Sequence, residues 1–159
     1  MYINIEVKTP YNADIKSKYN YLNSIQAVYR LICQYELFDS CCVSSFDRDV
    51  INEIQRLVNI GSKPLDIIHL YNFYDHMELP CPDEYLAVGS GINISATKLT
   101  KEVIDLCHAK GMKVGVWVDA SVFQENDCFY YNLFELKVDF FVTDYPLQVM
   151  QMRDQWIIK

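Results

Sequence analysis

Two charged side chains occur two residues apart near the beginning of the sequence, in the stretch I-N-I-E-V-K at residues 3–8. In a β-strand, Glu6 and Lys8 would share one face, and the apolar residues of the stretch would share the other. A carboxylate can ligate a divalent cation, and a lysine ammonium can bind a phosphate. The pair is therefore either part of a functional site or a solvated strand face or internal ion pair. The elements that position it decide between these alternatives.

Hydrophobic periodicity predicts that this stretch is the first of six short strands, all rich in Val, Ile and aromatic residues. The predicted strands are Ile3–Lys8, Cys42–Phe46, Asp66–Tyr71, Gly91–Ile94, Lys113–Asp119 and Asp139–Thr143.

Amphipathic helices are predicted between these strands. Apolar residues recur at three- and four-residue spacing in 22–35 and in 50–58, the second run following a predicted cap at Asp47. A third helix is expected to begin after Thr100 and to end at Lys110 and Gly111. Two more are expected at Cys128–Leu136 and from Pro146 through Met152, whereas residues 72–88 indicate a loop.

Alternating strands and helices predict an α/β fold with a parallel sheet, and without a linker we expect one domain over residues 1–159. Two architectures fit this pattern: an open doubly wound sheet and part of a closed eight-unit barrel. The sequence has no G-x-G-x-x-G and no G-K-[ST] turn, which disfavours an open nucleotide-binding sheet. A complete barrel needs about 250 residues. Six units fit the 159 residues of this sequence.

Composition restricts the class of protein. With 51% hydrophobic residues the chain can form a compact core, and its net charge of −7 argues against non-specific nucleic-acid binding. No apolar run approaches the length of a transmembrane helix, so we expect a cytosolic protein. The 6 cysteines form no C-x-x-C pair, which favours buried free thiols over metal ligands.

Five motifs in register resemble those of the glycerophosphodiester phosphodiesterases. The family's I-E-I-K-like strand, its S-S-F-D strand end, its helix ending in glycine and its final D-x-x-x-T-D-Y-P are matched here, and its V-W-T-V-N strand is matched less closely. The matching segments are I-E-V-K at 5–8, S-S-F-D at 44–47, C-H-A-K-G at 107–111, V-W-V-D-A at 116–120 and D-F-F-V-T-D-Y-P at 139–146.

This resemblance implies a partial (β/α)8 TIM barrel whose six parallel strands are the third to eighth of the complete fold. It also implies phosphoric diester hydrolysis in glycerophospholipid metabolism, in which a divalent cation, Ca²⁺ or Mg²⁺, polarises the phosphate and two histidines transfer protons. Glu6 would be a metal carboxylate and Lys8 a phosphate-binding cation, with Phe46 and Trp117 as walls for the glycerol or alcohol group. Val118 and Ala120 replace the Thr and Asn of the family's V-W-T-V-N.

The family's His-Arg and E-x-D motifs lie on its first two strands, and the sequence beginning at Met1 offers no counterpart. We therefore expect no complete catalytic set, no activity in the isolated chain and no cation binding of full strength. An alternative is complementation through the open sheet edges, by an N-terminal fragment or a second copy. A non-catalytic scaffold is a further alternative.

The interior of a barrel favours the site interpretation for Glu6 and Lys8, because buried charges are costly unless they are paired or coordinate a ligand. For the remaining polar candidates a structural role is favoured. Asp119 is expected to start a loop, His69 to pack, and His76 to lie in a solvated loop, although the two histidines could form a substitute acid–base pair or a metal cluster. His108 is expected to complement a helix dipole and Asp144 to cap a helix.

Overall fold

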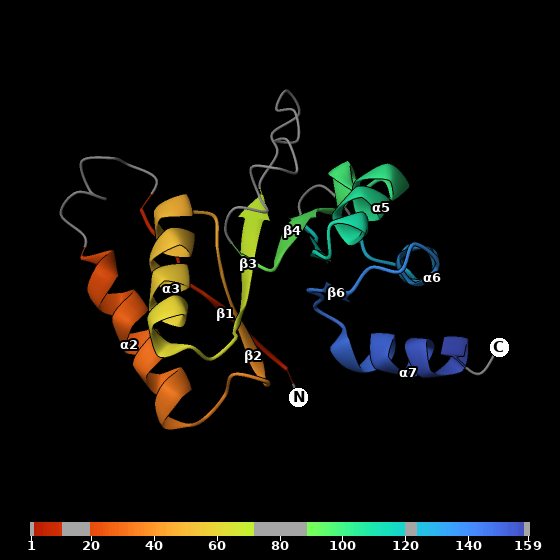
Figure 1. Ribbon diagram of the computed structural model, residues 1–159. Helices are drawn as coiled ribbons and strands as arrows, with labels where there is room; N and C mark the ends of the chain where they lie inside the picture. Colours follow the sequence, from red (N-terminus) through yellow and green to blue (C-terminus); the bar gives the residue numbers. More distant parts are fainter. Residues whose placement is uncertain (1, 11–19, 72–88, 120–123, 158–159) are drawn as a thin grey trace. The chain divides into compact units, whose positions relative to one another are not determined.

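A computed structural model of the chain describes residues 2–10, 20–71, 89–119 and 124–157 (Figure 1). Strands and helices alternate along it. Their order is β1 (Ile3–Glu6), α2 (Tyr21–Gln34), β2 (Cys41–Ser45), α3 (Arg48–Gly61), β3 (Asp66–Tyr71), β4 (Gly91–Ser95), the short 3₁₀ helix η1 (Ala96–Lys98), α5 (Lys101–Ala109), β5 (Lys113–Trp117), α6 (Asp127–Glu135), β6 (Phe140–Phe141) and α7 (Pro146–Ile157).

The strands follow one another in the sheet in the order of the sequence, from β1 to β6. The pairs β1–β2, β2–β3 and β5–β6 are parallel, as expected for strands joined by helical crossovers. All six predicted strands are present, and β3 has the predicted bounds. The last strand is shorter than predicted: only Phe140 and Phe141 are strand residues, because the Thr143 hydroxyl accepts a hydrogen bond from the Tyr145 N–H and turns the chain toward α7.

The described chain divides into two compact units. The first runs to Leu70 and includes residues 89–91, and the second comprises Tyr71 and the residues from Ile92 onward.

In the first unit, α2 and α3 lie side by side along one face of the strands (Figure 1). The core between these layers contains Val7, Val43 and Ile67 from the strands, packed against Ile25 of α2 and Ile54 of α3. Val43 and Ile67, which lie side by side in the sheet, thus face the helix-covered core, as the alternation of side chains along a strand predicts.

Helices α3 and α5 begin after residues whose side chains accept hydrogen bonds from backbone N–H groups of the first helical turn. Asp47 accepts a hydrogen bond from the Asp49 N–H at the start of α3, and Thr100 accepts one from the Val103 N–H at the start of α5. Helix α5 is followed by Gly111, whose φ of 73° is the left-handed conformation that glycine adopts most easily. These three predicted helix boundaries are confirmed.

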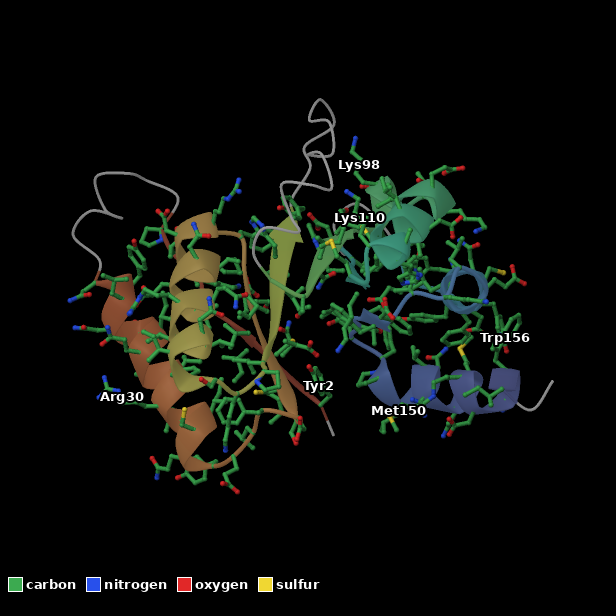
Figure 2. All side chains as sticks on the ribbon, in the orientation of Figure 1. Tyr2, Arg30, Lys98, Lys110, Met150 and Trp156 are labelled. Carbon is green, nitrogen blue, oxygen red and sulfur yellow. The ribbon has the colours of Figure 1, made fainter. Side chains whose placement is uncertain are left out.

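The second unit has an aromatic core. Tyr130 of α6 is buried with Val149 and Met152 of α7, and Phe134 and Phe141 pack against them. In Figure 2, Trp156 of α7 lies on the side of that helix that faces α6, where its ring is 5.8 Å from the Tyr131 ring and 6.3 Å from the Phe134 ring.

The cysteines correct one expectation. Cys41, Cys42 and Cys107 are buried free thiols, whereas Cys33 and Cys128 are exposed. The exposed pair lies on helices α2 and α6, on positions that face away from the packed stripe. Cys81 lies outside the described residues.

Within the described part of the chain, no helix is both long enough and apolar enough to span a bilayer.

Two isoleucines of α3 provide a matched test of this packing. Ile54 is fully buried, whereas Ile60 is 68% exposed. We expect Ile54→Ala to lower the free energy of unfolding by about 2–5 kcal/mol because it leaves a cavity. Ile60→Ala should change it by less than about 0.5 kcal/mol. Urea unfolding of both variants in reducing buffer measures the difference, and equal losses would contradict the packing described here.

Candidate functional site

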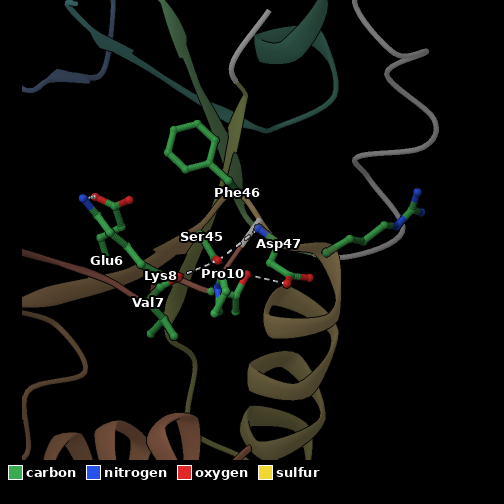
Figure 3. Close-up of a pocket in the computed structure, with 9 residues that line it drawn as sticks. Glu6, Val7, Lys8, Pro10, Ser45, Phe46 and Asp47 are labelled. Carbon is green, nitrogen blue, oxygen red and sulfur yellow. Dashed lines mark hydrogen bonds and ion pairs between the residues drawn. The ribbon is translucent and has the colours of Figure 1, made fainter. Parts of the chain in front are cut away.

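A pocket of about 410 Å³ lies where β1 and β2 end (Figure 3). Because the strands are parallel, both C-terminal ends meet at the same edge of the sheet, which is where α/β proteins commonly place their sites. The pocket is lined by Glu6, Val7, Lys8, Thr9, Pro10, Ser45, Phe46, Asp47 and Arg48. Three of the four residues that the sequence predicted for a site are therefore brought together: Glu6, Lys8 and Phe46.

The two faces of β1 differ as predicted. Val7 is buried in the helix-covered core, whereas Glu6 lies beside Ser44 in the parallel register, on the opposite face. On that same face the Asn4 carboxamide oxygen accepts hydrogen bonds from the Ser44 hydroxyl, at 2.8 Å, and from the Cys42 thiol, at 3.2 Å. The face that carries Glu6 is thus a polar surface with its own hydrogen bonds.

The apolar face is covered only in part. Ile5 packs against the core, but Ile3 is 41% exposed. The expectation that the whole Ile3–Ile5–Val7 face packs on helices therefore holds for its C-terminal end, next to the pocket, and is wrong for Ile3. Ile3 begins β1, which has only β2 as a neighbour among the described strands.

Glu6 and Lys8 form a loose ion pair. The Lys8 Nζ lies 3.9 Å from a carboxylate oxygen of Glu6, and the two side chains are 80% and 31% exposed, respectively. An exposed pair at this distance contributes little to stability, about 0–1 kcal/mol. Both groups are consequently able to exchange this contact for a ligand, Glu6 for a cation and Lys8 for an anion.

Hydrogen bonds fasten the end of β1 to the turn between β2 and α3. The Ser45 hydroxyl donates to the Val7 carbonyl at 2.7 Å and accepts from the Asp47 N–H at 3.1 Å. The Thr9 hydroxyl donates to the Asp47 carboxylate at 2.6 Å. Figure 3 shows these bonds beneath the pocket. They connect the two backbone segments that carry Lys8 and Phe46.

Ser45 and Thr9 were not predicted as site residues. Ser45 is 1% exposed and Thr9 is half-buried. Their positions next to Phe46 and Lys8 were visible in the sequence, but their hydrogen bonds join residues 38 positions apart.

His69 stands at the end of β3, beside Ser45 in the register. Burial and the nearby Arg48 guanidinium lower the pKa of its imidazole to about 4, against the opposing effects of a hydrogen bond with the Phe46 backbone and of the Asp47 carboxylate. The ring is therefore neutral at pH 7. A packed, hydrogen-bonded histidine agrees with the structural role favoured from the sequence.

Trp117, the fourth predicted site residue, belongs to the second unit. It is half-buried at the end of β5, where its indole N–H donates to the Tyr71 carbonyl at 3.1 Å. It shares a strand face with Gly115, where a Cβ would lie 2.1 Å from the Phe140 ring. Its role as a wall of the site stays a prediction. Asp119 follows β5 and is exposed, as expected for the beginning of a loop.

Three further candidates from the sequence remain, namely His108, Asp144 and His76. The His108 imidazole lies 2.8 Å from the Asp139 carboxylate, which also accepts the Val114 N–H, so it joins α5 to the sheet. The proposed capping role of Asp144 stays a prediction, and His76 lies outside the described residues.

Among the residues that the structure describes, no three His, Cys, Asp or Glu side chains come together in a group that could hold a metal ion. Glu6 nevertheless offers the hard carboxylate oxygen that Ca²⁺ and Mg²⁺ prefer. In the described pocket Glu6 can therefore supply one ligand of such a cation. Water, a phosphate or other residues would have to supply the others.

Comparison with solved structures identifies the fold. No protein-family model and no curated protein matches the chain. Its structure is similar to that of a proposed glycerophosphodiester phosphodiesterase from Galdieria sulphuraria, with 22% sequence identity, a TM-score of 0.76, and coverage of 95% of this chain and 56% of the other. A glycerophosphodiester phosphodiesterase from Parabacteroides distasonis is 16% identical with a TM-score of 0.70, over 98% of this chain and 58% of its own.

A third structure, an Oleispira antarctica phosphodiesterase in complex with the product sn-glycerol-3-phosphate, is 18% identical with a TM-score of 0.67. The match covers 97% of this chain and 56% of that protein. The chain has a partial glycerophosphodiester phosphodiesterase fold. It spans little more than half the length of these three solved relatives. The α/β class and the partial (β/α)8 barrel of six parallel strands, predicted from the sequence, are thereby confirmed.

The lowered pKa of His69 predicts a pH dependence of stability. Between about pH 6.5, where an unfolded histidine titrates, and the folded pKa of about 4, the unfolded chain binds more protons. The contribution of His69 is therefore complete above pH 6.5 and is lost as the pH falls. At pH 4.5 the loss should be about 2–3 kcal/mol.

His69→Gln removes this titration and keeps a donor for the Phe46 carbonyl. Denaturant unfolding at pH 7.5 and pH 4.5 should therefore show a smaller loss of stability in the variant than in the wild type. An identical loss in the two proteins would mean that His69 is not held in its neutral form.

Proposed function

We propose that this chain forms part of a phosphodiesterase of the glycerophosphodiester phosphodiesterase family and that its pocket binds the glycerol phosphate portion of a glycerophosphodiester. The observation that carries the proposal is the meeting of Glu6, Lys8 and Phe46 around one pocket at the strand ends, within this fold. The cytosolic setting predicted from the sequence agrees with a water-soluble substrate of glycerophospholipid metabolism.

The chemistry of the three side chains suits such a ligand. A phosphodiester anion repels nucleophiles, so a site that cleaves it must neutralise the charge and transfer protons. Lys8, whose side chain is 80% exposed, can pair its ammonium with a phosphate oxygen. Phe46 offers an apolar wall to the carbon atoms of glycerol. Glu6 would hold a divalent cation, which supplies Lewis acidity when bound.

The described residues of the pocket contain no histidine that could serve as its general acid or base. We therefore propose that this chain by itself binds glycerol phosphate weakly, with a dissociation constant on the order of millimolar, and does not turn over substrate. Residues beyond this pocket must complete the reaction.

Titration of isotope-labelled protein with sn-glycerol 3-phosphate, with and without Ca²⁺ or Mg²⁺, tests the proposal by NMR. Shifts should centre on residues 6–10 and 45–48 and should strengthen with the cation. Glu6→Gln should abolish the effect of the cation, and Lys8→Met should weaken binding at least threefold because a charge-assisted contact is lost.

The exposed pair Lys101–Asp105 on α5 is the matched control, with a separation of 2.5 Å between its charged atoms. Lys101→Met and Asp105→Asn should leave the titration unchanged. Shifts spread over both units, or equal effects of the control variants, would overturn the proposal. Turnover of glycerophosphocholine that Glu6→Ala abolishes would show that the chain is catalytically competent.

One observation favours complementation as a second candidate. Of the described strands only β2 lies beside β1, and the N–H groups of Ile3 and Val7 point toward β2. In a parallel strand the alternate peptide groups, here those of Asn4 and Glu6, point the other way. We propose that a strand of an N-terminal fragment or of a second copy pairs with this edge and thereby brings further groups next to Glu6.

Light scattering over a range of protein concentrations tests self-association. A second copy at this edge predicts a mass that rises with concentration, and Ile3→Lys should reduce it because a lysine on an edge strand opposes pairing. Ile60→Lys, at an exposed position on α3, is the control and should leave the mass unchanged. A constant monomer mass in every variant excludes the second copy as the partner.

A further inference from the structure

The hydrogen bonds beneath the pocket form one connected group. We propose that Ser45 and Thr9 are positioning residues that hold Lys8 and Phe46 in the lining of the pocket. The group consists of Val7, Thr9, Ser45 and Asp47, and we call it the clasp. The proposal rests on the glycerol phosphate site proposed above.

The clasp links two segments that are adjacent only in the folded chain. In the segment that follows β1, Val7 contributes its carbonyl and Thr9 its hydroxyl. At the end of β2, Ser45 contributes its hydroxyl, and just after it Asp47 contributes its N–H and carboxylate. The bonds run from Val7 through Ser45 and Asp47 to Thr9, with lengths between 2.6 and 3.1 Å. They therefore form a continuous chain across the strand ends.

The clasp residues flank two further residues that line the pocket. Lys8 lies between Val7 and Thr9, and Phe46 lies between Ser45 and Asp47. Fixing the backbone on both sides of a residue restricts where its side chain can point, which lowers the entropy that binding must still remove. Lys8 is 80% exposed and lacks packing of its own, so this restriction has to come from its neighbours.

Asp47 also connects the clasp to the core. One carboxylate oxygen accepts the Asp49 N–H at 2.9 Å and so caps α3, while the other accepts the Thr9 hydroxyl. Helix α3 is anchored in the core by Val50 and Ile54. Helix α3, which is anchored through its buried face, is thus connected to the end of β1.

Three variants test the clasp through a signal that does not need a ligand. The Val7 N–H, bonded to the Ser44 carbonyl at 2.8 Å, reports local opening of the end of β1 by hydrogen exchange. Thr9→Val keeps the shape and removes the donor, and it should speed Val7 exchange about three- to tenfold. Thr9→Ser keeps the hydroxyl and should stay within about twofold of the wild type. Ser45→Ala breaks two hydrogen bonds and should speed Val7 exchange more than Thr9→Val does.

The affinity for sn-glycerol 3-phosphate should change by the same factors as Val7 exchange. It should be weakened in Thr9→Val and restored in Thr9→Ser. Thr100→Val is the matched control because it removes a hydroxyl that accepts the Val103 N–H at the start of α5 in the second unit. It should destabilise α5 and leave both Val7 exchange and affinity unchanged.

The outcomes separate this proposal from the one it rests on. Unchanged Val7 exchange in Thr9→Val, or equal effects of Thr9→Val and Thr9→Ser, would overturn the clasp. Faster Val7 exchange together with unaltered affinity would overturn the positioning role. If Val7 exchange is faster in Thr9→Val but neither the wild type nor any variant binds sn-glycerol 3-phosphate, the clasp is supported as a structural device and the proposed function is overturned.

Discussion

Parallel pairing of β1 with β2 is the constraint on which the pocket depends. In a parallel pair both strands point the same way, so Glu6 at the end of β1 and Ser45 at the end of β2 meet at one edge of the sheet. An antiparallel pair would place the end of one strand beside the beginning of the other. The walls of the pocket would then have no common location, and the bonds from Ser45 and Asp47 to Val7 and Thr9 could not form.

The same pairing separates two functions on the two faces of β1. Val7 contributes to the core against α2 and α3, whereas Glu6 lies on a face whose buried neighbour Ser44 already bonds the Asn4 side chain. Buried polar groups are tolerable only when they are hydrogen-bonded, and this face meets that condition at Ser44. The site therefore uses residues that the hydrophobic core does not need.

The core of the second unit is rich in aromatic rings. Its helices α6 and α7 pack mainly through rings, with Tyr130 buried between Phe129 and Phe141. The Tyr130 hydroxyl donates a hydrogen bond to the Glu125 carboxylate and shares another with the Thr143 hydroxyl. The pKa of the phenol is raised to about 12. Burial is the largest cause of the shift, followed by the bond to Glu125, although the bond to Thr143 has a lowering effect. A buried polar end is thus satisfied by the residues that flank α6 and β6.

The sequence by itself determined the elements and the fold class. Period-two alternation located the strands, and the capping residues Asp47 and Thr100 located two helix starts, because local hydrogen bonds and side-chain direction decide these features. Strand ends were less certain: the predicted Asp139–Thr143 is only Phe140–Phe141, since the pairing partner and the following turn decide where a ladder stops. Cys33 and Cys128 were predicted to be buried and are exposed, because composition does not reveal which face of a helix packs.

For the site, too, the sequence determined one part and the tertiary structure decided the other. The types and spacing of Glu6 and Lys8 were sufficient to single them out, and the resemblance to known phosphodiesterases gave them roles and added Phe46. Only the tertiary structure decided that these three line one pocket and that Ser45 and Thr9 form hydrogen bonds across the strand ends beside it. The physical reason is that strand alternation is a local property of consecutive residues, whereas a hydrogen bond such as that from Thr9 to Asp47 joins residues 38 positions apart and exists only after the sheet has formed.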